Sequence, residues 1–361
     1  MSSEILLVPH TVNGFGAIEH RLCTTVLAML YGLVKRFDNM TSNTHRCQSI
    51  LTMQSVARLR SASSSRGISV IEVVVAMAII GLLMAIALPA IQSARQAARK
   101  TQCLSNVRQI SLAMTNYANT HQSFPPSGVM NGASFLVRLL PYLEQDALYS
   151  RFDFNRSMRE QVPLAFRRPA VFACPTDPVV GAIRFRSNYS GNSGWYQEST
   201  PGSARWGNSF LVGPIPFITE PALSFEQIPD GLSSTVAISE VLPSGGSDVK
   251  RAVWKEKPST PIFRRPVEVM GNECLAATTF TFAWPRASMW TLPGFGETIY
   301  DHVLSPNTRS CLWVFNAGSS HSSGVHSGLC DGSARFISAH IDTVVWRSIG
   351  TRNGGETVAL P

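Results

Sequence analysis

The chain has 361 residues, of which 44% are hydrophobic and 15% are charged. This length allows one or two domains and a core that needs no disulfide or metal in order to fold. The low share of charge excludes an intrinsically disordered chain, and it also excludes a coiled-coil rod rich in Glu and Lys.

The formal net charge of +8 does not indicate a nucleic-acid site. Half of it lies in residues 1–67, where seven Lys and Arg stand against three Asp and Glu, and residues 68–361 carry 24 basic against 20 acidic side chains. A nucleic-acid site gathers positive charge on one face. We therefore expect a mildly basic, solvated surface and no nucleic-acid partner.

Residues 68–91 are 24 residues with a single charged side chain, Glu72. A helix of that length measures about 36 Å and can cross a hydrocarbon core of about 30 Å. Arg58, Arg60 and Arg66 precede it, and basic flanks stay in the cytoplasm. The sequence predicts a single pass through membrane lipid, with the residues that follow it on the side of the membrane away from the cytoplasm.

A carboxylate at the centre of a bilayer costs about 3 kcal/mol, so Glu72 needs a partner. Gly67, Ile68, Glu72 and Pro89 stand in a pattern that resembles the prepilins and pseudopilins of type IV pilus-like and type II secretion systems. The resemblance implies that a prepilin peptidase cleaves after Gly67 and methylates Ile68. It also implies that Glu72 pairs with the amine of a neighbouring subunit during assembly. The membrane would then be the bacterial inner membrane, with the head in the periplasm or on the cell surface.

Residues 1–67 would then be a leader, which is long for this class. Met53 begins a shorter basic leader and is a candidate for the true start of translation, in which case the preceding residues are a misassigned extension.

Beyond Pro89 the helical pattern becomes amphipathic, and it should end before the Pro125–Pro126 pair. We expect one pilin-like helix over 68–122, a head domain over 123–345 and a C-terminal tail over 346–361. The head should be mostly β, with one more helix over 133–149, so that the fold class is α+β. The expected strands include residues 235–238, 279–283, 312–315 and 334–337.

Residues 68–340 resemble a prepilin-like family of unknown function that is abundant in planctomycete-type bacteria. Its members end in a signature of His, nine residues and Asp-Gly, which is His321 and Asp331-Gly332 here. The resemblance implies a cell-envelope protein with no established biochemical activity. Further matching segments contain Cys103, Cys174, Asp177, Asn188, Asp230-Gly231 and Glu240.

The signature has two interpretations. His321 and Asp331 are common ligand types, and His326 lies between them, but further ligands at convincing spacing are not visible. Asp-Gly is also a strong turn signal, for Asp331-Gly332 as for Asp230-Gly231. We expect turns, with a hydrogen-bonded histidine, and neither a metal nor a cofactor.

Five cysteines lie beyond residue 67, so at least one is unpaired within the chain. A Cys103–Cys174 disulfide would tie the helix to the head, two of the other three could pair within the β region, and buried free thiols remain the alternative.

Nucleophile-elbow, P-loop, zinc-protease and dinucleotide-binding patterns are all missing from the sequence, so we expect no enzyme and no catalytic residues. The sequence favours a pseudopilin-like structural subunit whose partners are a prepilin peptidase and copies of itself or other pilin-like subunits. The alternative is a single-pass anchored envelope protein whose head binds a ligand and which does not polymerise.

Overall fold

The computed structural model describes residues 69–128, 132–194, 222–244, 251–255, 267–281, 287, 289–294, 296–311 and 314–355. The chain divides into two units, residues 1–72 and 73–361. The predicted leader, with Gly67 and Ile68, lies outside the described residues.

Helix α2 spans Val70–His121 and confirms the predicted long helix. It ends where Gln122 takes a left-handed backbone conformation (φ 55°), shortly before the two prolines that lack a backbone donor. From Ser69 to Gln102 every residue is exposed, whereas from Cys103 onward one face is buried.

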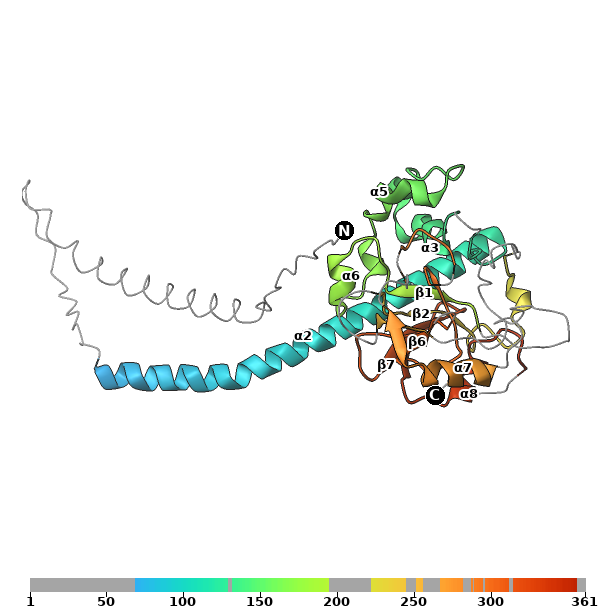
Figure 1. The fold of residues 1–361 in the computed structure, drawn as a ribbon. Coiled ribbons are helices and arrows are strands. Elements are labelled where there is room, and N and C mark those ends of the chain that lie inside the picture. The colour runs from blue at the N-terminus through green and yellow to red at the C-terminus, as the bar shows by residue number, and fades with distance from the viewer. Residues whose placement is uncertain are drawn as a thin grey trace, which may run out of the picture. The chain divides into compact units, whose positions relative to one another are not determined.

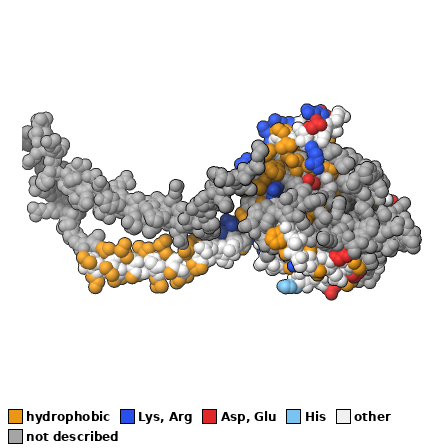
Figure 2. Space-filling model, in the orientation of Figure 1, with side chains coloured by type: hydrophobic (Ala, Val, Ile, Leu, Met, Phe, Trp, Pro, Cys, Tyr) orange, Lys and Arg blue, Asp and Glu red, His pale blue; other side chains and the backbone are white. Residues whose placement is uncertain are grey.

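The first part of α2, from Val70 to Ile91, is apolar on all sides except for Glu72. Figure 2 shows hydrophobic side chains along this stretch on the face in view, and Val70, Leu82 and Ile86 are each more than 60% exposed. In the part of the chain that the structure describes, α2 is the one helix long and apolar enough to cross a membrane. A helix exposed to water normally has a polar face, so the surface of this stretch is suited to contact with lipid or with other apolar helices.

The first part of the head consists of short helices, and the described residues between His121 and Tyr189 contain no strand. The prediction of one helix over 133–149 is wrong. Pro141 lacks a donor inside the second short helix of this region, and Glu144 follows in a left-handed conformation (φ 58°), so the chain turns twice. These helices are α3 Phe135–Arg138, η1 Leu140–Leu143, α4 Asp146–Tyr149, η2 Met158–Gln161, α5 Val162–Ala165, η3 Ala170–Phe172 and α6 Pro178–Ala182.

The main sheet has five strands in the order β5-β1-β2-β7-β8. β1 and β5 are parallel, and the other neighbours are antiparallel. The strands are β1 Tyr189–Asn192, β2 Val236–Glu240, β5 Ile299–Tyr300, β7 Gly324–Leu329 and β8 Ala334–Ser338.

A second sheet has the order β4-β3-β6, with β3–β4 antiparallel and β3–β6 parallel. Its strands are β3 Val253–Lys255, β4 Thr279–Thr281 and β6 Ser310–Cys311, and the remaining helices are η4 Phe225–Gln227, α7 Val267–Ala276 and α8 Thr343–Ser348. The expected strand at 312–315 does not form as such: Val314 makes an isolated bridge with Cys311, and residues 312–313 lie outside the described residues.

The main sheet packs against α2, as Figure 1 shows for β1, β2 and β7. A Cβ on Gly328 of β7 would collide with the Ser111 hydroxyl of α2, so glycine at this position allows the strand and the helix to approach closely. A second core contains Val325, Ile337 and Trp346 of α8. Because Trp346 is fully buried, the head continues past the predicted boundary at residue 345.

His302 is fully buried and stacks on Trp346. Its Nδ1 donates to the Trp346 carbonyl (2.7 Å), so its Nε2 accepts from the Tyr300 hydroxyl (2.8 Å). Burial lowers the pKa of His302 from 6.5 to about 3, although the bond to Trp346 opposes the shift. Between pH 6.5 and about 3, the unfolded chain binds a proton at His302 that the folded head does not bind. The contribution of His302 to the stability of the head is therefore complete above pH 6.5 and is lost as the pH falls.

We therefore expect the free energy of unfolding to fall by up to about 1.4 kcal/mol per pH unit between pH 6.5 and about 3 through this group alone. Denaturant titrations at several pH values should show a shallower acid slope for His302→Gln than for the wild type. The exposed His340→Gln variant should keep the wild-type slope. Equal slopes in all three proteins would contradict the assignment.

Candidate functional site

Glu72 lies in the first turn of α2, where one of its carboxylate oxygens accepts a hydrogen bond from the Ser69 backbone N–H (2.9 Å). The side chain is exposed. A carboxylate at this position is stabilised by the helix dipole and by orphaned N–H groups. It is therefore preorganised as a negative group at the start of the helix, accessible to a cation from another molecule.

The predicted turn residues serve as turns. Asp331 caps the β7–β8 turn by accepting from the Ser333 N–H (2.8 Å), and Gly332 has φ 87°. Gly231 has φ 98°, and the Asp230 carboxylate accepts from the N–H groups of residues 354 and 355.

His321 and Asp331 stand at opposite ends of β7, since one precedes and the other follows this six-residue strand. Six residues of strand measure about 20 Å. The two signature residues therefore do not form one ligand pair, and His321 belongs to a different group of side chains.

That group surrounds Glu240 at the end of β2. One carboxylate oxygen, Oε2, accepts from the backbone N–H of His326 (2.8 Å) and lies 3.1 Å from His326 Nδ1. The other oxygen, Oε1, lies 3.7 Å from His321 Nε2 and has no hydrogen-bond partner, although Glu240 is only 1% exposed.

The His321 ring lies against the disulfide between Cys103 and Cys174, with Nε2 3.7 Å from Cys174 Sγ. Burial lowers the pKa of the His321 imidazole; the Glu240 carboxylate opposes this shift, and His326 and Lys100 add to it. The disulfide joins α2 to the segment after η3, and so connects the helix with the head.

The structure contains a second disulfide, between Cys274 of α7 and Cys311 of β6. Cys330 is free and buried, and burial raises the pKa of its thiol well above the ordinary range.

A buried ion pair adjoins the first disulfide. Asp177 accepts from Arg251 through both oxygens (2.8 and 3.1 Å) and from the Asn188 side chain (2.7 Å). Asn188 in turn accepts from the backbone N–H of Cys174 (2.8 Å). Asp177 also caps α6, and this network fixes the segment that carries Cys174.

Sequence reasoning assigned no role to Glu240, Asp177 or Arg251. Glu240 was visible as the acid that ends an apolar strand, a place where a charge needs partners. Its partners could not be found from spacing, because His321 and His326 follow more than 80 residues later.

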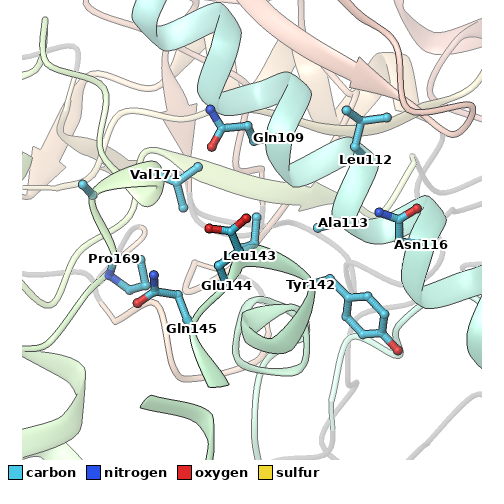
Figure 3. Close-up of a pocket in the computed structure, with 11 residues that line it drawn as sticks. Gln109, Leu112, Ala113, Asn116, Tyr142, Leu143, Glu144, Gln145, Pro169 and Val171 are labelled. Atoms are coloured by element: carbon cyan, nitrogen blue, oxygen red, sulfur yellow. The ribbon is translucent and has the colours of Figure 1, made fainter. Parts of the chain in front are cut away.

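A cavity of about 450 Å³ lies between α2 and the segments around η1 and η3. Figure 3 shows Gln109 and Asn116 of α2 facing Tyr142, Glu144 and Val171 across it. Its lining contains one carboxylate, that of Glu144, and no His, Cys, Lys or Arg.

Two family models match the chain. The prokaryotic N-terminal methylation motif matches residues 62–88, and this match supports a prepilin-like protein of the type IV pilin type. The model of a family described as a protein of unknown function (DUF1559) matches residues 92–343, which is more than half of the sequence. The chain therefore belongs to that family. No curated protein and no solved structure matches the chain.

Proposed function

We propose that this chain is a pseudopilin-like structural subunit that is cleaved by a prepilin peptidase between Gly67 and Ile68. It is anchored by the first half of α2 in the inner membrane, with its head in the periplasm or on the cell surface. It assembles there with copies of itself or with other pilin-like subunits, in a type II secretion or type IV pilus-like system.

The observation that carries the proposal is that the methylation motif at 62–88 overlaps the stretch of α2 from Val70 to Ile91, which is exposed and apolar on all sides except for Glu72. In water this stretch would expose many large side chains, each worth about 1.5–3 kcal/mol when buried. Lipid covers them in the anchored subunit. Neighbouring α2 helices can cover them in a filament, so one surface serves both states.

Glu72 supports assembly over simple anchoring. An anchor needs no charge in its apolar segment, and a carboxylate there is costly. Cleavage after Gly67 leaves a new amine on Ile68, four residues before Glu72. The carboxylate of one subunit then offsets the amine of the next, and neither charge is left alone in the apolar bundle.

The cleavage step is tested by co-expression with a prepilin peptidase. We expect Gly67→Leu to abolish conversion of the precursor to the shorter mature form on a denaturing gel. Gly81→Leu is the matched control, because Gly81 lies in α2 with no atom within 4 Å of an added Cβ, and its precursor should be processed normally. Processing of Gly67→Leu at the wild-type rate would refute the assigned site.

A further inference from the structure

Four potential metal-ligand side chains meet where α2 joins the head. Cys103 Sγ, Cys174 Sγ, a ring nitrogen of His321 and a carboxylate oxygen of Glu240 all lie within 4.8 Å of one another. They come from α2, from the segment after η3, from the turn before β7 and from the end of β2. In the described part of the chain, this is the one place where three or more such groups converge.

The Glu240 oxygen that faces this cluster lacks a hydrogen-bond donor. Leaving a buried polar atom unsatisfied costs about 1–3 kcal/mol, and more when the group is charged. His326 holds the opposite oxygen and so fixes the orientation of the carboxylate. This oxygen of Glu240, which lies 3.7 Å from His321 Nε2 and accepts no hydrogen bond, is therefore placed to bind a cation.

We propose that, once the Cys103–Cys174 disulfide is reduced, this cluster binds one Zn²⁺ through both thiolates, His321 Nε2 and the Glu240 carboxylate. Two sulfur ligands, one imidazole and one carboxylate form an ordinary tetrahedral zinc set. At zinc bond lengths, such ligand atoms lie about 3.4–3.8 Å apart. The His321 nitrogen lies 3.7 Å from both Cys174 Sγ and the Glu240 oxygen.

The surroundings hold the ligands in place. Asn307 donates to the His321 carbonyl (2.8 Å), and the Ser319 hydroxyl accepts from the His321 N–H (3.0 Å). Asn188 fixes the backbone of Cys174. Such supporting bonds orient metal ligands and raise affinity.

The disulfide and the metal exclude each other, since each uses the same two sulfur atoms. A dithiol reductant supplies two electrons and two protons, which break the S–S bond, give two thiols and leave the reductant as its own disulfide. Zn²⁺ then displaces the two thiol protons. Reoxidation by a disulfide oxidant removes two electrons, re-forms the S–S bond and releases the ion.

Either bond ties α2 to the head. The zinc form would keep the helix attached to the head while the thiols are reduced, and the disulfide would replace it under oxidising conditions. Zinc binding at this cluster does not depend on whether the chain polymerises.

The test uses the full chain in detergent, in two samples. One is oxidised; the other is reduced, and its reductant is then removed under anaerobic conditions. Each sample is incubated with Zn²⁺, desalted and analysed for bound metal; Co²⁺ replaces Zn²⁺ in a parallel series. We expect one zinc per reduced chain and none per oxidised chain, with a thiolate-to-cobalt charge-transfer band in the reduced sample alone. Equal zinc content in both forms, or none in either, would overturn the proposal.

Variants assign the ligands. His321→Ala and Glu240→Gln keep both cysteines and should weaken zinc binding by at least about tenfold. The matched control replaces Cys274 and Cys311 by Ser, which removes the other disulfide and should leave zinc binding unchanged. If the control lost zinc while His321→Ala retained it, the metal would be bound by Cys274 and Cys311, and the proposed site would be refuted.

Discussion

Replacing Glu72 by Ala should remove the subunit from assemblies while its head stays folded. The carboxylate and the neighbour's amine meet in an apolar bundle, and breaking a buried pair costs about 3–5 kcal/mol. That corresponds to at least about a hundredfold in the association constant. Cross-linking in membranes, with quantitation of the high-molecular-weight fraction, measures the loss.

Glu226→Ala is the matched control, since Glu226 is an exposed carboxylate of the head. It should assemble as the wild type does. Normal incorporation of Glu72→Ala would sink the assembly mechanism and favour the alternative, an anchored protein whose head binds a ligand without polymerising.

The largest effect on the stability of the head is expected from Asp177→Ala. This change removes both bonds to Arg251, the bond from Asn188 and the cap of α6. It leaves the Arg251 guanidinium, whose side chain is 4% exposed, without its counter-charge. Breaking such a pair from one side lowers the free energy of unfolding by about 3–5 kcal/mol.

Glu160→Ala provides the comparison within the same chain. It breaks the Arg156–Glu160 pair, whose side chains are 59% and 57% exposed, and exposed pairs contribute at most about 1 kcal/mol. Denaturant titration of the tryptophan fluorescence of both variants measures the difference. Similar losses for the two variants would show that burial of the Asp177 network is not what stabilises this region.

Local patterns predicted α2 well, because its signals lie within the helix itself: an unbroken apolar run, a 3.6-residue period and two terminating prolines. The same kind of pattern failed over 133–149. There the apolar spacing continues through the turns at Pro141 and Glu144, because successive short helices each turn an apolar side toward the core around α2. The periodicity therefore predicted correctly which side chains are buried, but it predicted one continuous helix where the chain forms several short ones.

The cluster around Glu240 could not be derived from the sequence for a different reason. The β2–β7 register aligns Ser239 with Ser327 and so brings Glu240 beside His326. This strand pairing joins segments more than 80 residues apart, and the sequence of neither segment alone predicts it. We expected turns at the His321 and Asp331 signature, with a ligand pair as the alternative, and the two residues lie apart because the nine residues between them contain the whole of β7.

The central claim is that this chain is a processed, assembling pilin-like subunit. The most direct test is mass spectrometry of the N-terminal peptide of the mature protein, isolated from membranes of the cells that make it. The account predicts a chain that begins at N-methylated Ile68. An intact leader, or a different first residue, would contradict it and leave an ordinary anchored envelope protein.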